Sequence, residues 1–380
     1  MEHFYTEAQI AVRDMVRRFA ETKVLDEAAA IDRDDRFPHE IYRAMAELGL
    51  YGAAVPEAAG GSGFDTITLA LAMEELARCS GSVGNILAVP VEAVRFLHDH
   101  GDASHKALIA DIVLGKRIPA TCVSEPDHGS DVAGIKTIAM RDGDHYVING
   151  TKAWVSLGQV ADLIFVFAKT DRDAGHRGIS CLIVDGDNPG VKRGRKERLL
   201  GMHGLATCQI VFEDCCVPAT RRIGPEHGAF KMAMANFNFS RILMAAMALG
   251  MTQAAFEDAM TYAKGRIQFG NPIFEYQAVQ FMLADMSTDI AAARLLIHHG
   301  ARLFDAGHSI AKEAAHLKLF TTDMAMKHVT NALQIHGGNG YSQEYRIERI
   351  FRDIKLPQIY EGTNQIQRLI IARQIARELA

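Results

Sequence analysis

The chain has 380 residues, more than the ~100–200 typical of one domain, so its length predicts two or three packed units or one large one. With 48% hydrophobic and 23% charged residues, its composition is that of a globular protein, and the net charge of −5 gives no electrostatic reason to expect a nucleic-acid partner. The longest uncharged apolar stretch, between Arg241 and Glu257, is shorter than the roughly 18–20 residues of a membrane helix. We therefore expect a buried core helix there and no membrane partner.

Neither end of the sequence carries a signal that would target the protein out of the cell interior. Residues 1–5 lack the basic and apolar regions of a secretion signal, and residues 377–380 are no peroxisomal or retention tag. We expect a cytoplasmic protein, with a mature form in the mitochondrial matrix as the alternative.

The cysteines and histidines do not predict a disulfide framework or a metal site. The six cysteines show no CxxC spacing, and the 16 histidines include no HExxH pattern and no paired Cys/His spacing. A chain of this length does not require disulfides to build a core. We expect reduced packing residues at Cys79, Cys122, Cys181, Cys208, Cys215 and Cys216.

Residues 1–119 are predicted to form an N-terminal α-helical domain. Residues 9–30 are rich in Ala, Arg, Val and Glu, and residues 68–77 are a further helix-forming stretch. The glycine-rich residues 60–63 predict a loop between them. The character of the sequence changes near Pro119.

Residues 120–225 are predicted to form a β domain. Asn149-Gly150 separates two apolar runs, and because this dipeptide tolerates positive φ angles, it predicts a tight hairpin turn. Further β-branched, apolar runs bounded by Gly, Asp and Pro predict strands at residues 163–168, 179–184 and 209–212.

Residues 226–380 are predicted to form an α-helical bundle, because apolar residues recur there with the period of a helix. One stripe comprises Val279, Met282, Leu283, Met286, Ile290, Ala293 and Ile297. A second comprises Ala315, Leu319, Thr322, Met326, Val329 and Leu333. Long apolar stripes on adjacent helices imply antiparallel packing. The apolar residues 232–297 also suggest more hydrophobic surface than one chain covers, and hence an oligomer.

Taken alone, the polar and glycine-rich segments are each compatible with more than one structural role. Residues 125–131 are either a loop that carries binding groups or a linker. Residues 337–340 follow a helical pattern, which favours a helix cap over a dinucleotide-binding loop. The absence of GxxxxGK and GxSxG argues against a nucleotide triphosphatase and a serine hydrolase.

Glu361 lies in a turn between apolar segments. Partial removal from water would raise its pKa toward the range of a general base. The alternatives are a solvated turn residue or a charge at a helix N-terminus.

Five motifs follow one another along nearly the whole chain: residues 123–126 with 129–131, 148–156, 266–270 with Gln277, 334–340, and 352–353 with 359–368. Together they resemble the acyl-CoA dehydrogenase family. The resemblance implies a mainly α fold with a central, β-barrel-like domain and a C-terminal four-helix bundle. It also implies an oxidoreductase of fatty acid metabolism that uses FAD and converts acyl-CoA to trans-2-enoyl-CoA.

The resemblance assigns a role to individual residues. Glu361 would remove the α-proton, while the hydride leaves the β-carbon for flavin N5. Roles in binding the thioester are implied for Ser130, Asn238, Arg241, Tyr360 and Gly362. Roles in holding FAD are implied for Cys122, Val123, Ser124, Gly129, Ser130, Trp154, Ser156, Arg266, Phe269, Gln277, Gln334, Gly337, Gly338, Thr363 and Gln365. Of these, Arg266, Phe269 and Gln277 would reach FAD bound mainly by another subunit of a homotetramer.

Three positions depart from the commonest family pattern. Asp127-His128 replaces a usual Gly-Ala pair, and Asn238 stands where many members carry an Asp that meets the adenine end of CoA. Some branches carry their base near the position of Ser240, but serine cannot take that role and Glu361 is present.

The implied partners are an acyl-CoA, or a thioester of acyl carrier protein, and an electron-transfer flavoprotein. Two alternatives are an oxidase of the same fold that uses oxygen and a non-catalytic protein that binds acyl thioesters.

Overall fold

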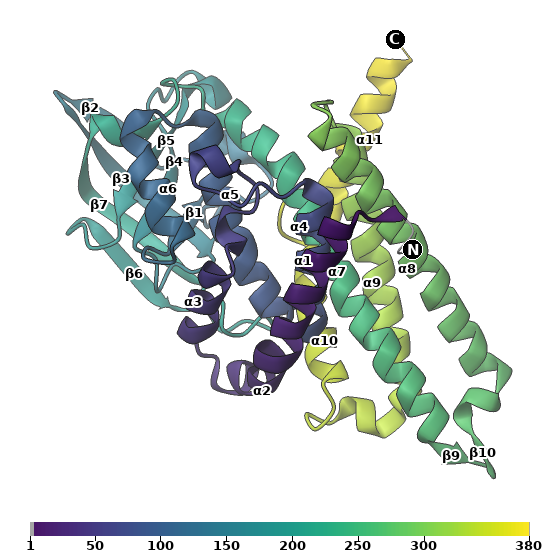
Figure 1. Ribbon diagram of the computed structural model, residues 1–380. Helices are drawn as coiled ribbons and strands as arrows, with labels where there is room; N and C mark the ends of the chain where they lie inside the picture. The colour runs from purple at the N-terminus through teal and green to yellow at the C-terminus, as the bar shows by residue number, and fades with distance from the viewer. Residues whose placement is uncertain (1–3, 380) are drawn as a thin grey trace.

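The computed structural model describes residues 4–379 and confirms the predicted order of a helical region, a β region and a second helical region (Figure 1). The first helices are α1 (Glu7–Phe19), a π-helical turn (Ala20–Val24), α2 (Leu25–Asp34), α3 (His39–Glu47), α4 (Thr66–Cys79), α5 (Gly81–His100) and α6 (Lys106–Val113). The helices predicted at residues 9–30 and 68–77 lie within this set.

Polar caps fix the starts of the helices that matter for the site. The Asp65 carboxylate accepts from Thr68 N at the start of α4, and the Ser80 hydroxyl accepts from Val83 N at the start of α5. Both helices are buried on nearly all sides, so their apolar composition is explained by packing inside the fold.

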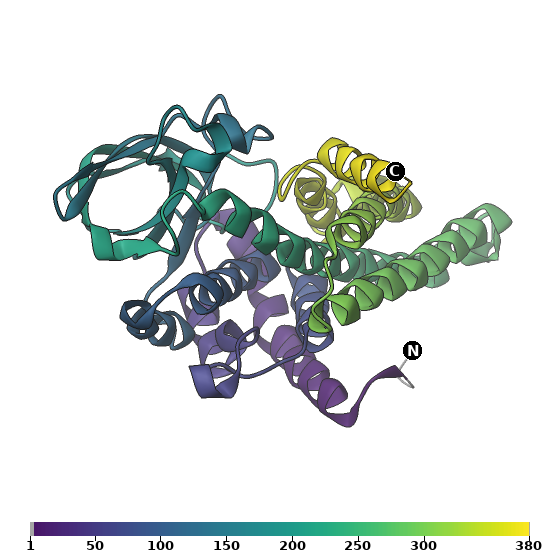
Figure 2. The same cartoon turned by 90° about the horizontal axis from the view of Figure 1, so that it is seen from above.

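The β region forms one curved sheet. Its strands are β1 (Pro119–Cys122), β2 (Ile138–Asp142), β3 (His145–Val155), β4 (Leu163–Lys169), β5 (Ile179–Asp185), β6 (Val191–Lys196), β7 (Cys208–Pro218) and β8 (Arg222–Ile223). Their order is β6-β7-β3-β2-β4-β5-β8, with β1 parallel to β4. Viewed from above, the strands curve into a barrel-like ring (Figure 2).

The predicted hairpin at Asn149-Gly150 is wrong, because β3 runs through both residues. The Asn149 side chain exchanges two hydrogen bonds with Asp214, and the pairing with β7 shifts register between Ile148 and Gly150. A Cβ on Gly150 would lie 2.5 Å from Thr137 Oγ1, so the glycine serves a close approach of two chain segments. The turn that joins β2 to β3 lies earlier, at residues 143–144.

The C-terminal bundle consists of α7 (Ala229–Gly265), α8 (Gln277–Asp305), α9 (Ala311–His336), the short α10 (Ile347–Asp353) and α11 (Asn364–Glu378). By length and hydropathy α7 could cross a membrane, but 89% of its apolar window is buried inside the fold. It packs against α4, α5, α8 and α9, which confirms the core helix expected between Arg241 and Glu257.

The apolar surface of α7 is buried within one chain. The expectation that this helix leaves apolar surface for another subunit to cover is therefore wrong. Exposed apolar side chains lie instead on α8, at Phe281 and Leu295, and at Phe269. Phe269 lies in the small ribbon of β9 (Ile267–Gln268) and β10 (Asn271–Pro272) at the tip of the bundle (Figure 1).

The prediction for the cysteines holds for five of the six. Cys216 is exposed on β7, so a packing role is wrong for it, because successive residues of a strand face opposite sides and its neighbour Cys215 takes the inner face.

Candidate active site

Glu361 lies on a strained turn between a 3-10 turn (Leu356–Gln358) and α11. Glu361 and Gly362 both have left-handed backbone conformations, with φ of +54° and +82°, which costs free energy for a glutamate. The carbonyl oxygen of Glu361 accepts from Arg241 Nε at 3.3 Å and from Gln367 Nε2 at 3.1 Å. The carbonyl oxygen of Gly362 accepts from Lys318 Nζ at 2.9 Å and from Gln367 Nε2 at 2.7 Å. These buried donors hold the turn in its conformation.

The Glu361 carboxyl group is placed as a base would be. Burial raises its pKa above the ordinary value, although Ser240, Arg241 and Lys318 each stabilise the charged form. Its Oε2 atom has no hydrogen-bond partner among residues 4–379. The group is therefore neither a solvated turn residue nor a simple helix-end charge, and one oxygen is free to accept a proton.

A second carboxyl group, that of Glu92 on α5, lies beside the first. The Ser240 hydroxyl on α7 donates to Glu92 Oε1 at 2.8 Å. Burial and the Glu361 charge raise the pKa of Glu92 well above its ordinary value. Both side chains are partly accessible although they lie deep in the fold, as expected of groups that line a cleft. Glu92 was not among the predicted site residues, although it is the only acidic residue between Glu75 and Asp99.

The α5 wall of the site carries further polar groups. Asn85 Nδ2 donates to the Tyr360 hydroxyl at 3.0 Å, and that hydroxyl contacts Met247 Sδ at 3.8 Å. Asn85 and Glu92 are two turns apart, so they share one face of the helix. Gly84 does not belong to this face, since a Cβ there would lie 3.2 Å from Ala77 and from Met247.

The other predicted substrate residues lie on or near the turn. The buried guanidinium of Arg241 also donates through Nη1 to Asn238 Oδ1 at 2.8 Å. Arg241, Asn238, Tyr360 and Gly362 are thus brought together with Glu361. Ser130 lies apart from them, exposed in the loop after β1.

Several predicted cofactor residues are unusually exposed, whereas Cys122 is completely buried on β1. Trp154 is 64% exposed on β3 at a register shift, with φ of +59°, and Phe269 is 95% exposed with φ of +51°. A Cβ added to Gly337 or Gly338 would meet nothing within 4 Å. Exposed aromatic faces and open glycines fit a flat, extended cofactor or a partner surface that covers them.

One chain cannot bring all of these residues to one cofactor. Trp154, Ser124 and Ser156 belong to the β region, whereas Arg266, Phe269 and Gln277 belong to the far tip of the bundle (Figures 1 and 2). Gln334, Gly337 and Gly338 are exposed at the end of α9, and Gln365 is exposed on α11. Thr363 caps α11 by accepting from Ile366 N. This separation fits a site shared between subunits.

The motif around Glu125 has a structural explanation. The carboxylate of Glu125 accepts from Lys136 N at 2.6 Å, Thr137 N at 2.8 Å and Lys152 Nζ at 2.9 Å. Lys152 also donates to Val123 O and is completely buried. This ion pair fastens the loop after β1 to β3, with Ser124 O accepting from Ala153 N.

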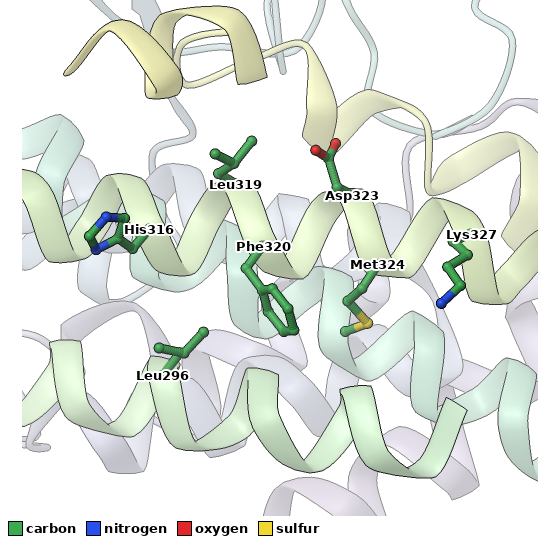
Figure 3. Close-up of a pocket in the computed structure, with 7 residues that line it drawn as sticks. All are labelled: Leu296, His316, Leu319, Phe320, Asp323, Met324 and Lys327. Carbon is green, nitrogen blue, oxygen red and sulfur yellow. The ribbon is translucent and has the colours of Figure 1, made fainter. Parts of the chain in front are cut away.

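A mostly apolar hollow of about 560 Å³ lies elsewhere, between α8 and α9 (Figure 3). It is lined by Leu296, His316, Leu319, Phe320, Asp323, Met324 and Lys327, none of which was predicted as a site residue. Asp323 at its edge accepts from Asn364 and Gln358, so the hollow adjoins the segment that carries Glu361 without containing it.

Comparisons with known proteins agree with this architecture. Family models for the N-terminal, middle and C-terminal domains of acyl-CoA dehydrogenase match residues 6–111, 120–215 and 228–376. An acyl-CoA dehydrogenase of Bacillus subtilis is 41% identical, over 97% of this chain and 98% of its own. The "Caffeyl-CoA reductase-Etf complex subunit CarC" of Acetobacterium woodii is 36% identical, over 99% of this chain and 100% of its own.

A solved structure gives the same result for the fold. The butyryl-CoA dehydrogenase of Megasphaera elsdenii superposes with a TM-score of 0.96 at 36% identity, over 99% of this chain and 100% of its own. Full-length similarity of sequence and fold, together with the three domain matches, shows that the chain belongs to the acyl-CoA dehydrogenase family of flavoprotein oxidoreductases.

Proposed function

We propose that the chain dehydrogenates an acyl thioester, converting acyl-CoA to trans-2-enoyl-CoA, with Glu361 as the base that removes the α-proton. The observation that carries this proposal is the Glu361 carboxyl group itself. It lies deep in the fold, burial raises its pKa, and its Oε2 has no partner among the described residues. A general base needs a pKa near the working pH and a free oxygen within reach of the proton.

The turn also supplies a donor for the thioester oxygen. The backbone N–H of Glu361 makes no backbone hydrogen bond within residues 4–379, whereas the carbonyl oxygens of the turn are both held. We propose that this N–H donates to the thioester oxygen and stabilises the enolate-like charge as the α-proton leaves. Arg241, bound to the Glu361 carbonyl, keeps the N–H and the carboxyl group in fixed positions.

The cofactor that we propose is FAD, which supplies the hydride acceptor for the β-carbon. Ser124, Trp154 and Ser156 would hold the isoalloxazine in one subunit. Arg266, Phe269, Gln277, Gln334 and Gly338 would hold the adenine diphosphate half from a neighbouring subunit of a homotetramer. Trp154 and Phe269 are both exposed, and the elements that carry them, β3 and the β9–β10 ribbon, lie far apart in Figure 1, which supports this division.

For the electron acceptor we propose an electron-transfer flavoprotein. The Acetobacterium woodii relative is by name a subunit of a complex with such a flavoprotein. An oxidase that passes electrons to oxygen remains the second candidate, and anaerobic reduction followed by mixing with each acceptor separates the two. The Glu361 carboxyl group, whose Oε2 has no partner among the described residues, argues against a non-catalytic binding protein.

For the substrate we propose a short-to-medium, straight or lightly branched acyl group. A Cβ on Gly84 of α5 would meet Ala77 and Met247, so this glycine packs against α4 and α7 and adds no depth to an acyl pocket. Each buried CH₂ contributes roughly 0.8 kcal/mol, so affinity should rise with chain length until the pocket is full. A titration of flavin absorbance with acyl-CoAs of graded length, and with the same acyl groups on acyl carrier protein, tests both the length and the carrier.

The decisive test of the base is Glu361→Gln. Glutamine keeps the size of the side chain but cannot accept a proton, so FAD and ligand binding should survive while flavin reduction falls by at least roughly 10²–10⁴-fold. Glu40→Gln, at an exposed position on α3, is the matched control and should reduce its flavin like the unaltered protein. Rapid-mixing measurement of flavin bleaching gives both rates. Reduction of Glu361→Gln at the unaltered rate would show that another group is the base.

A further inference from the structure

Glu92 on α5 carries a carboxyl group that the reaction proposed above does not use. Its Oε1 accepts from the Ser240 hydroxyl on α7 at 2.8 Å, and its Oε2 accepts no hydrogen bond within residues 4–379. The side chain remains partly accessible, so Oε2 is open to a bound molecule.

Hydrogen bonds from two consecutive residues of α7 place Glu92 beside the turn that carries the base. Ser240 donates to Glu92, and Nε of the next residue, Arg241, donates to the Glu361 carbonyl oxygen at 3.3 Å. The Glu361 charge raises the pKa of Glu92, so the two carboxyl groups lie within electrostatic reach of each other. An acyl group whose α-carbon meets Glu361 therefore passes close to Glu92.

No cation among residues 4–379 balances a charge on Glu92. Arg241 and Lys318 both stabilise the charged form of Glu361. For Glu92, only the Ser240 hydroxyl favours the charged form, while burial and the Glu361 charge oppose it. The cleft thus holds a carboxyl group that lacks the counterions its neighbour has.

Arg95, one turn further along α5, does not supply the missing counterion. Its Nε lies 3.3 Å from Asp99 Oδ2, and its guanidinium lies 4.5 and 4.4 Å from the ring centroids of Phe239 and Phe304. An ion pair and two aromatic faces thus surround this cation. A counterion for Glu92 is left to a bound molecule.

The chemistry of the acyl group decides whether the Glu92 carboxyl group is satisfied in the complex. A plain alkyl chain would displace water from Oε2 and offer no hydrogen bond in return, which costs free energy. A hydroxyl group would satisfy the oxygen but could not balance a charge. An ammonium group does both, and it also offsets the excess of carboxyl groups in the cleft.

We propose that Glu92 determines the specificity of the acyl cleft and selects acyl thioesters that carry an ammonium group on the γ-carbon. This inference rests on the proposed function and deepens it by naming the substrate class. The γ-carbon is two bonds beyond the α-carbon at which Glu361 acts, so a group there is presented to the neighbouring carboxyl group. Glu92 holds the ammonium and takes no part in the proton removal.

Binding of such a thioester should release a proton. In the empty cleft Glu92 is a carboxylic acid, because burial and the Glu361 charge hold its pKa well above the ordinary value. An ammonium group beside it favours the carboxylate, and the proton of Glu92 then passes to solvent. An uncharged acyl group of the same shape leaves that proton in place.

The first test compares two thioesters of nearly the same shape. In 4-(dimethylamino)butyryl-CoA the nitrogen is protonated at neutral pH, and in 5-methylhexanoyl-CoA a carbon replaces it. Anaerobic rapid mixing with the FAD-loaded protein gives the rate of flavin reduction and the apparent Kd for each. We expect the ratio of rate to Kd to favour the cationic thioester by at least roughly 30-fold, as for a charge pair that leaves water.

Variants at position 92 assign this preference to its carboxyl group. Glu92→Gln keeps the size of the side chain but carries no charge, so the preference should disappear. Glu92→Leu should reverse it, because an apolar side chain accepts the neutral thioester and leaves the ammonium unpaired. Glu40→Gln, at an exposed position on α3, is the control and should keep the preference.

The second test measures binding without flavin reduction. The 2-enoyl forms of both thioesters have no hydride to give, so calorimetry with them reports binding alone. Titrations in two buffers of different ionisation enthalpy should show release of up to about one proton per site with the cationic ligand. The neutral ligand should release none, and neither should the cationic ligand with Glu92→Gln.

The outcomes separate this inference from the proposed function. Equal rates and affinities for the two thioesters, or a preference that survives in both Glu92 variants, would overturn the ammonium specificity and leave the dehydrogenase intact. Failure of every acyl-CoA to reduce the bound flavin would count against the proposed function. Calorimetry with the 2-enoyl thioesters would still decide whether Glu92 binds the ammonium, and absence of proton release would refute it.

Discussion

The ammonium group of Lys318 on α9 donates to the carbonyl oxygen of Gly362 and to Asn364 Oδ1, each at 2.9 Å. Its side chain is completely buried, and burial lowers its pKa to about 7 despite the nearby Glu361 charge. Asn364 in turn donates to Thr322 and Asp323 on the same helix. A buried lysine thus ties the turn that carries Glu361 to the core of the bundle.

Replacing Lys318 by methionine should shift the pH dependence of flavin reduction. The variant loses the donor to the turn and a cation that stabilises charged Glu361, so the pKa of Glu361 should rise further. The pH of half-maximal reduction should therefore move upward. Rapid mixing with acyl-CoA across a pH series measures this, and Lys327→Met, at an exposed position on the same helix, is the control. Identical pH profiles would mean that Lys318 has no influence on Glu361.

Lys318 should also make the free energy of unfolding depend on pH. The pKa of Lys318 is about 7 in the folded protein and about 10.4 in an unfolded chain, so between these values the unfolded chain binds more protons. The contribution of Lys318 to the free energy of unfolding is complete above the pKa of the unfolded chain. It is lost as the pH falls through the pKa of the folded protein. Relative to Lys318→Met, unfolding free energy should rise by up to about 1.4 kcal/mol per pH unit in this window. Urea unfolding at several pH values checks this, and parallel curves would contradict it.

The Glu125–Lys152 pair makes Glu125→Gln a test of stability. Burial raises the pKa of Glu125, but the Lys152 charge and the bonds from Thr137 and Lys136 outweigh it, so the pKa lies below its ordinary value. Removing this charge leaves Lys152 buried and unpaired, which costs about 3–5 kcal/mol. Chemical denaturation measures the loss.

The double variant Glu125→Gln/Lys152→Met distinguishes two causes of lost stability: the unpaired charge of Lys152, and the loss of the hydrogen bonds that hold the loop after β1. Removing both charges should recover a large part of the stability, because a buried pair can be replaced by apolar groups at little cost. A double variant no more stable than Glu125→Gln would show that the ion pair is not the cause.

Phe269→Ala should weaken cofactor retention without harming the isolated fold. The ring is 95% exposed in one chain, so its removal costs little stability there, whereas burial against FAD or a partner would contribute about 1.5–3 kcal/mol. FAD affinity should then fall by about 10–100-fold. Flavin content after dialysis and molar mass by light scattering give the result. Leu114→Ala, at the C-cap of α6 where the side chain is 60% exposed, is the control, and equal flavin retention in both would refute a role for Phe269.

Local patterns in the sequence were sufficient for the domain order, the long helices and the motif around Glu361. Helical periodicity is set by the backbone and by the need to bury one face, so the stripes that include Met286 and Val329 could be read directly. The hairpin at Asn149-Gly150 failed because a local turn preference lost to pairing with β7 and to the approach of Thr137. Lys318 lies on the buried face of α9, but the helical period of the sequence does not predict which groups its ammonium contacts.

Only the tertiary structure brought Glu92, Ser240 and Glu361 into one cleft from three separate elements. It also showed that Gly84 packs against α4 and α7 and that β3, which carries Trp154, lies far from the β9–β10 ribbon, which carries Phe269. The sequence determines which chemical groups are available, since the residue type sets which hydrogen bonds a side chain can donate or accept and which charge it can carry. Their protonation and their partners depend on burial and on neighbours distant in sequence, which are settled only when the helices pack.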